Sequence, residues 1–152
     1  MKLNRIYRQQ LIKSDINNVW KYFSSPVNLP EITPGWLNFK IISGVPEKMY
    51  EGLVIEYRVS PFLNMKVKWI TEITYVKEPY FFVDEQRFGP YRFWHHKHFF
   101  EETNDGNVLM TDEVHYIAPL NFLTGAVISK KLNDIFNYRH NKIEEIFNRE
   151  RL

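Results

Sequence analysis

A long stretch of alternating apolar and polar residues, followed by one helical repeat, constrains the fold of this chain more than any other feature. In residues 65–75, apolar side chains such as Trp69 fall on one face and mostly polar side chains on the other. This period of two is typical of a strand with one buried face. Residues 125–148 instead carry apolar side chains every three or four positions, which is typical of an amphipathic helix. The pattern predicts an antiparallel sheet and one long helix.

Caps and turns mark the other elements. Asp15 is a good N-cap for a helix over residues 16–23, which Pro26 ends, and a short helical turn is expected over residues 27–32. The Asn-Asp-Gly sequence at residues 104–106 predicts a hairpin turn between the last two strands. The predicted strands cover residues 1–12, 37–41, 53–59, 65–75, 80–88, 91–102 and 107–117.

Strands that follow one another without intervening helices favour an α+β domain. A seven-stranded antiparallel sheet is large enough to curve around the long C-terminal helix, with two short helices after strand 1. A sheet wrapped around a helix leaves a space that large side chains must line or fill. No repeat, low-complexity tract or linker divides the sequence, so residues 1–152 are expected to form a single domain.

Composition narrows the classes of function. The chain has no cysteine, which excludes disulfides, cysteine-based zinc sites and a cysteine nucleophile. A net charge of +2 lacks the basic excess of a nucleic-acid-binding surface. No segment reaches the roughly 18 consecutive apolar residues of a membrane span, and residues 1–12 lack the pattern of a secretory signal. We therefore expect a cytoplasmic protein that binds no nucleic acid.

Polar residues interrupt the apolar face of the last three predicted strands. At even positions, Asp84 and Gln86 lie on one strand, His96 and His98 on the next, and Asp112 on the last. The odd positions carry the charged side chains expected at a solvent face, so the even positions are expected to point inward. A buried polar group without a partner costs about 1–3 kcal/mol. These side chains must therefore satisfy one another, bind water or bind a ligand.

Several chemical interpretations of these residues are open. In a self-contained network, each imidazole pairs with a carboxylate, and Arg139 of the helical stripe pairs with Asp84 or Asp112. In the interpretation that we favour, the same residues form the polar floor of a ligand pocket. His96, His98 and a carboxylate also match a metal-binding pattern, but spacing fixes no third ligand, so we expect no metal and no cofactor. His96, His98 and Asp112 are the candidates for acid–base catalysis, although no nucleophile or phosphate-loop motif accompanies them.

Four segments of the sequence carry a family resemblance. They are INNVWKYFSSPVNLPEITP, DEQRFGPYRFWHHKHFFEE, MTDEVHY, and IFNYRH in the final helix. Through them the whole chain resembles the SRPBCC superfamily, which includes START domains, birch-pollen-allergen-like proteins and polyketide cyclases. The resemblance implies a helix-grip fold that binds a small hydrophobic or amphipathic molecule such as a lipid, quinone or polyketide. It does not imply one activity, because the superfamily contains carriers, sensors and enzymes.

We therefore expect a carrier or sensor rather than an enzyme; the alternative is a cyclase- or dehydratase-like catalyst that uses a His–Asp acid–base pair. The apolar loops at Phe62-Leu63 and Phe122-Leu123 either gate the cavity, touch a membrane transiently or pack locally. Ligand identity and oligomeric state stay open. The predicted ligand-binding residues are Phe39, Tyr57, Trp69, Phe82, Asp84, Gln86, Trp94, His96, His98, Asp112, Val114, Ile135, Phe136 and Arg139.

Overall fold

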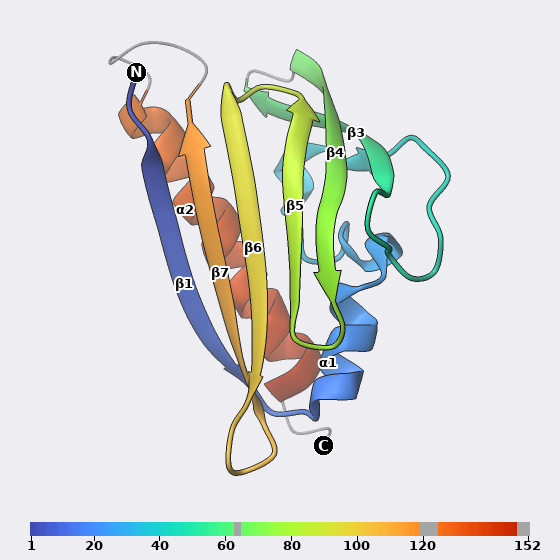
Figure 1. Ribbon diagram of the computed structural model, residues 1–152. Helices are drawn as coiled ribbons and strands as arrows, with labels where there is room; N and C mark the ends of the chain where they lie inside the picture. Colours follow the sequence, from blue (N-terminus) through green and yellow to red (C-terminus); the bar gives the residue numbers. More distant parts are fainter. Residues whose placement is uncertain (63–64, 119–124, 149–152) are drawn as a thin grey trace.

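Seven antiparallel strands curve around one long helix in the part of the chain that the computed structural model describes, residues 1–62, 65–118 and 125–148 (Figure 1). The strands are β1 (Asn4–Ile12), β2 (Lys40–Ile41), β3 (Val54–Phe62), β4 (Met65–Lys77), β5 (Phe81–Phe88), β6 (Phe93–Glu102) and β7 (Val108–Ile117). The helical elements are α1 (Ile16–Phe23), the 3₁₀ helices η1 (Pro26–Asn28) and η2 (Gly35–Leu37), α2 (Gly125–Ile143) and the π-helical turn η3 (Glu144–Asn148). The predicted α+β class and helix-grip arrangement are confirmed.

The strands from β2 to β7 form a meander, in which each strand pairs with the next one along the chain. β1 returns to pair with β7, so the order across the sheet is β1-β7-β6-β5-β4-β3-β2. Register shifts interrupt the β3–β4 and β4–β5 pairs, and such irregularities bend a sheet. α2 runs behind β1, β7 and β6 in Figure 1, across the concave face of the sheet.

α1 lies where the sequence predicts it. The carboxylate of Asp15 accepts hydrogen bonds from two backbone N–H groups of the first turn, which would otherwise lack partners. The apolar face of the helix is buried. Trp20 meets the rings of Phe82 and Phe100 edge-on, with ring centres 6.0 and 5.9 Å apart. These contacts fix α1 against the concave face of the sheet.

The segment between α1 and β3 differs from its prediction. A short helical turn is present, but it is the 3₁₀ helix η1, which overlaps only the start of the expected residues 27–32. Pro30 has no N–H group for an α-helical hydrogen bond, and η2 follows only at residues 35–37. Of the predicted strand over residues 37–41, only β2 is extended and paired. Asn38 has a φ of 47°, in the left-handed region, and this conformation ends η2 and interrupts the extended chain.

α2 follows the predicted helical repeat, and η3 continues it to Asn148. Its buried side chains recur every three or four residues through Ile128, Leu132 and Phe136, which face the sheet. Arg139 follows Phe136 by three residues and therefore lies on the same face of the helix. The predicted placement of a charged residue in the apolar stripe is thus confirmed.

The core consists of two apolar clusters with polar side chains between them. On β6, the inward-facing residues are Trp94, His96, His98 and Phe100, and all four are buried. Phe100 belongs to a cluster around α1, and Trp94 belongs to a second cluster against α2. Trp69 of β4 packs against both clusters. The two histidines therefore occupy positions where apolar packing would otherwise be continuous.

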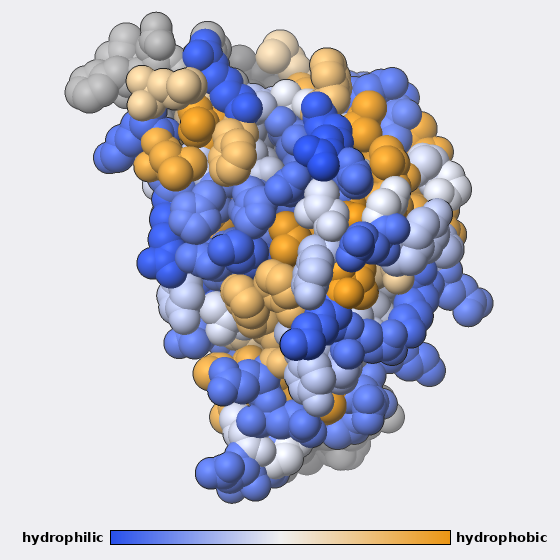
Figure 2. Space-filling view, in the orientation of Figure 1, coloured by the Kyte–Doolittle hydropathy of each residue, from blue (hydrophilic) through white to orange (hydrophobic). Residues whose placement is uncertain are grey.

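The face of the sheet that points away from α2 is mostly hydrophilic, with smaller hydrophobic areas between the polar side chains (Figure 2). Arg87 forms ion pairs there with Glu72 and Glu85, while Phe81 and Phe99 stack with ring centres 4.5 Å apart. The odd positions of β5 and β6 thus face outward, as the sequence predicts. Within the described ranges, no helix is both long and apolar enough to cross a membrane.

Candidate functional site

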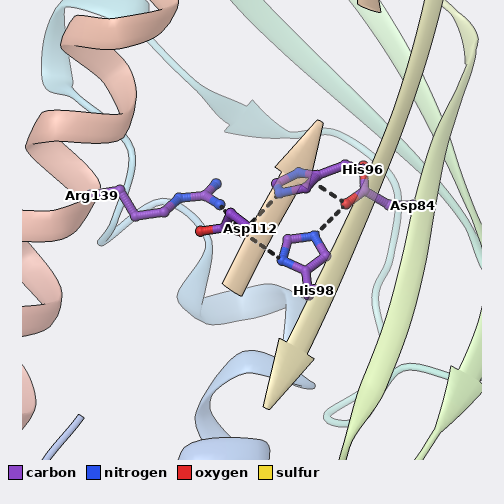
Figure 3. Close-up of polar contacts among 5 residues, drawn as sticks. All are labelled: Asp84, His96, His98, Asp112 and Arg139. Carbon is purple, nitrogen blue, oxygen red and sulfur yellow. Dashed lines mark hydrogen bonds and ion pairs between the residues drawn. The ribbon is translucent and has the colours of Figure 1, made fainter. Parts of the chain in front are cut away.

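The strand register brings together the predicted polar residues of the last three strands. Asp84 lies opposite His96 in the β5–β6 pair, and His98 lies opposite Asp112 in the β6–β7 pair. Their side chains extend from the sheet toward α2, and Arg139 of α2 extends toward them (Figure 3). We refer to these five residues as the polar cluster. Three adjacent strands and one helix contribute to it.

The two aspartates and two histidines of the polar cluster alternate in a closed ring of contacts (Figure 3). Oδ2 of Asp84 lies 2.7 Å from Nε2 of His98 and 3.5 Å from Nδ1 of His96. Oδ1 of Asp112 lies 2.8 Å from Nε2 of His96 and 3.1 Å from Nδ1 of His98. The 3.1 Å contact lacks the alignment of a hydrogen bond. Each histidine therefore lies between two carboxylates, and each carboxylate contacts both histidines.

Arg139 contacts this ring from the helix side, at Asp112. Its Nη1 atom lies 3.6 Å from Oδ1 of Asp112, and its guanidinium carbon lies 5.2 Å from the ring centre of Phe136. Only 13% of the arginine side chain is exposed. Its Nε atom is buried and has no hydrogen-bond partner among the described residues. Arg139 therefore keeps one donor that the surrounding protein does not satisfy.

The protonation states of the polar cluster are coupled. Burial opposes ionisation of Asp112, but the hydrogen bond with His96 and the close contact with His98 hold its pKa well below its ordinary value. Burial also opposes ionisation of Asp84, and the charges of the two histidines lower its pKa. Burial would lower the pKa of His98, but Asp112 and Asp84 together raise it. The pKa of His96 is lowered by burial and by the charge of His98. These opposite shifts make His98 the more basic of the two imidazoles.

Aromatic rings hold the two imidazoles in place. Phe82 stacks on His98 with ring centres 4.0 Å apart, and the rings of His96 and His98 lie 3.7 Å apart. Trp94 and Phe136 meet His96 edge-on, at 6.2 and 5.8 Å between ring centres. The imidazoles cannot rotate without displacing these rings, so the polar cluster is preorganised.

A cavity of about 190 Å³ lies beside the polar cluster, between the sheet, α2 and the segment that contains η1 and η2. Its wall is mostly apolar. Trp69 contributes an indole Nε1 atom that is buried and has no partner within the described part of the chain. All but three of the predicted ligand-binding residues line the cavity: Phe39, Tyr57, Trp69, Phe82, Asp84, Trp94, His96, His98, Ile135, Phe136 and Arg139.

The other three predicted residues lie outside the cavity wall. The amide of Gln86 donates to the backbone carbonyl of Tyr91 at 2.7 Å and accepts from its N–H at 3.2 Å, so it closes the β5–β6 connection instead. Val114 is completely buried beneath neighbouring side chains. Asp112 lies behind the histidines and borders a separate cavity of about 130 Å³ between β1 and α2, which also contacts Gln10.

Several cavity residues were not predicted. Ile128 and Leu132 share the helical repeat with Ile135, so the repeat contained enough information to find them. The cavity residues between Tyr22 and Leu37 include Pro26, Leu29 and Ile32. That segment has neither a helical nor a strand period, so no sequence signal gave the direction of its side chains.

The prediction for the apolar loops is not tested. Phe62 ends β3 opposite Met65. Leu63, Phe122 and Leu123 lie outside the described residues. Gating of the cavity and contact with a membrane therefore stay predictions.

Solved structures with the same fold as this chain come from plants and bacteria. Major latex-like protein 151 from Panax ginseng has a TM-score of 0.69 and 20% identity, over 94% of this chain and 96% of its own. A START superfamily protein from Mycobacterium smegmatis has a TM-score of 0.66 and 11% identity, over 95% and 97%. The chain has the fold of a START superfamily protein. A protein from Chromobacterium violaceum, with a TM-score of 0.71 and 12% identity over 97% and 99% of the two chains, shares it.

This likeness confirms the fold that the sequence resemblance implies. No family model and no curated protein matches the sequence. At 11–20% identity the START fold is shared without evidence of a shared activity, because one fold supports many functions. The function must therefore be argued from the cavity and the polar cluster.

Proposed function

We propose that this protein is a carrier or sensor that binds a small hydrophobic or amphipathic molecule in the cavity between the sheet and α2. The observation that supports this function is a mostly apolar cavity of about 190 Å³ with the polar cluster at its wall. In such sites the apolar wall binds the body of a ligand, and a few polar groups orient it. The resemblance to the SRPBCC superfamily supports the same class of ligand, such as a lipid, quinone or polyketide.

The cavity volume limits what can bind. An apolar cavity of about 150 Å³ holds benzene, whereas pockets for drug-sized ligands measure about 300–1,000 Å³. A cavity of about 190 Å³ therefore suits a molecule of one or two rings, or one end of a longer chain.

Two unsatisfied donors indicate an oxygen atom on the ligand. Nε1 of Trp69 and Nε of Arg139 belong to cavity residues, and neither has a partner in the described part of the protein. Leaving a buried donor unpaired costs about 1–3 kcal/mol. A carboxylate, phenolate or carbonyl oxygen would recover part of this energy, most strongly at the charged guanidinium. We therefore infer an amphipathic ligand whose oxygen-bearing end meets Arg139.

Fluorescence titration with 1-naphthoic acid, a two-ring molecule with one carboxylate, tests this function. The wild-type protein is expected to bind it at one saturable site. Ile135→Trp places a large ring in the cavity and is expected to weaken binding by roughly tenfold or more, equivalent to about 1.4 kcal/mol. Val127→Trp is the matched control on the exposed side of α2, where Val127 is 54% exposed, and it should bind as the wild type does. Equal effects of the two tryptophans would contradict binding in the cavity.

An acid–base enzyme is the second candidate. Asp84 and His98 favour it, because they border the cavity, contact each other at 2.7 Å and have shifted pKa values. Binding without catalysis has better support, since both ring nitrogens of His96 and of His98 already face carboxylates. Turnover of a polyketide-type substrate that is lost in His98→Gln, while 1-naphthoic acid still binds, would favour the enzyme.

A further inference from the structure

We propose that Asp84, His96 and His98 bind a divalent first-row transition-metal cation, such as Zn²⁺, at the polar end of the cavity. One ligand atom from each residue lies within 4.8 Å of the others. Two imidazole nitrogens and one carboxylate oxygen are a donor set that such cations prefer. The strand register supplies the third ligand that sequence spacing could not fix, because Asp84 lies opposite His96. This site does not depend on the organic ligand proposed for the cavity.

Two of the three distances between the ligand atoms lie within about 0.7 Å of those in a tetrahedral site. Oδ2 of Asp84 lies 2.7 Å from Nε2 of His98 and 3.5 Å from Nδ1 of His96. Metal–ligand bonds of about 2.1 Å in a tetrahedral site place the ligand atoms about 3.4 Å apart. The cation would take the place of the proton between His98 and Asp84, and that proton would leave to solvent. The contact from Asp84 to His98 would lengthen by about 0.7 Å, while the contact to His96 already has the required length.

Asp112 provides the support that metal-binding histidines need. A histidine that binds a metal through one nitrogen nearly always donates a hydrogen bond from the other, often to a carboxylate. Nε2 of His96 lies 2.8 Å from Oδ1 of Asp112, and Nδ1 of His98 lies 3.1 Å from the same oxygen. Asp112 therefore faces the second ring nitrogen of both histidines, and it hydrogen-bonds that of His96. Asp112 acts as a positioning residue in this site.

The charges of the polar cluster also favour a cation. Asp84 and Asp112 contribute two negative charges, whereas Arg139 contributes one positive charge. Once the proton between His98 and Asp84 has left, as metal binding requires, the buried cluster has one uncompensated negative charge. A divalent cation changes this to one net positive charge. A carboxylate or phenolate from the cavity ligand would then complete both the charge balance and the coordination.

The proposed site is open toward the cavity. Asp84, His96 and His98 all border the cavity, and the side chain of Asp84 is 19% exposed. A site with three protein ligands and an accessible fourth position can bind an oxygen atom from a small molecule. The site would therefore have a fourth position open to an oxygen atom of a small molecule.

Titration of chelator-treated protein with Co²⁺ alone, followed by its visible absorption, tests the metal site. The wild type is expected to saturate at a single equivalent. Asp112→Asn should weaken binding by roughly 10- to 100-fold, the usual effect of removing an outer-shell partner. Asp84→Asn and His98→Gln should weaken it further.

The outward face of the sheet offers matched controls. His95 and His115 are cross-strand neighbours on β6 and β7, on the side away from the cavity. His95→Gln and His115→Gln should leave the Co²⁺ affinity unchanged. Loss of binding in these variants, with His98→Gln binding normally, would overturn the proposal, as would no saturable binding to the wild type.

Crystals of the wild type soaked with Co²⁺ give a test that does not depend on the folding of any variant. The proposal predicts an anomalous-scattering peak between Asp84, His96 and His98. A peak at His95 and His115 instead, or no peak in the polar cluster, would overturn it.

Discussion

Nε2 of His96 lies 2.8 Å from Oδ1 of Asp112, and the two side chains are only 4% and 8% exposed. His96 belongs to β6 and Asp112 to β7, so this contact joins two neighbouring strands from inside the molecule. Removing one partner of a buried pair leaves the other without compensation. The stability of the fold and the chemistry of the cavity therefore depend on the same side chains.

Asp112→Ala is expected to lower the free energy of unfolding by about 3–5 kcal/mol, because His96 loses its hydrogen-bond partner and Arg139 loses its buried anion. Glu113→Ala is the matched control at the next position. Glu113 pairs with Arg5 and Lys97 on the outward face, where the expected change is about 0–1 kcal/mol. Urea denaturation followed by circular dichroism measures both. Similar losses in the two variants would show that buried pairing is not the source of the stability.

The polar cluster should also determine how the free energy of unfolding of the metal-free protein falls at acid pH. The pKa of Asp112 in the folded chain lies well below its ordinary value of 3.8, so the unfolded chain binds the proton first as the pH falls. The stabilisation is present above about pH 4 and is lost as the pH falls toward the folded pKa. With a chelator present, the free energy of unfolding should decline more steeply below about pH 4 in the wild type than in Asp112→Asn. Asp105→Asn, in the exposed hairpin turn, should follow the wild type, and parallel curves for Asp112→Asn would refute the prediction.

Arg139 should select for charged ligands. Hydrogen bonds to charged groups contribute about 1.5–3 kcal/mol, so Arg139→Gln is expected to weaken binding of 1-naphthoic acid by roughly 10- to 100-fold. Binding of 1-naphthalenemethanol, which has the same rings without the charge, should change little. Arg8→Gln is the control, because Arg8 hydrogen-bonds Asn133 and does not line the main cavity. Equal weakening of the acid and the alcohol would show that Arg139 does not recognise the anion.

Gln86 should matter for stability and not for binding. Its amide makes two hydrogen bonds to the backbone of Tyr91, so Gln86→Ala should cost about 1–3 kcal/mol. For a chain of this size each kcal/mol lowers the Tm by about 2–4 °C. Affinity for 1-naphthoic acid should stay at the wild-type value. A normal Tm combined with weaker binding would place Gln86 in the cavity wall after all.

Gly89 offers a separate test of the same connection. A Cβ atom at this position would lie 2.5 Å from Oε1 of Gln86. Gly89→Ala should therefore destabilise the wild type more than it destabilises a Gln86→Ala background, with a coupling of about 0.5–3 kcal/mol in thermal or urea unfolding. Additive effects would show that the amide moves aside freely.

Strand periodicity predicted much of the fold and of the polar cluster. Side chains alternate faces along a strand, so the parity of Asp84, His96 and Asp112 was enough to place them on one face. The helical repeat likewise placed Arg139 among apolar residues facing the sheet. The odd or even position of a residue along a strand does not show which inward-facing side chains reach a cavity. Val114 faces inward like His96, yet neighbouring side chains cover it completely.

The predictions from strand periodicity were wrong in two places because of local backbone effects. Gln86 lies near the end of β5, and its amide hydrogen-bonds the backbone carbonyl and N–H of Tyr91 instead of lining the cavity. A local hydrogen bond of this kind leaves no periodic pattern in the sequence. In the segment before β2, Asn38 in the left-handed region breaks the alternation that Leu37 and Phe39 suggest. This segment forms part of the cavity wall opposite the sheet. The residues of that wall could therefore not be predicted from the sequence.

A crystal structure of the protein with 1-naphthoic acid tests the central claim most directly. The proposed function predicts that the naphthalene ring lies in the cavity between Trp69 and Phe136, with its carboxylate within hydrogen-bond distance of Arg139. A cavity without the acid, in crystals where the acid binds elsewhere on the surface or not at all, would contradict the account.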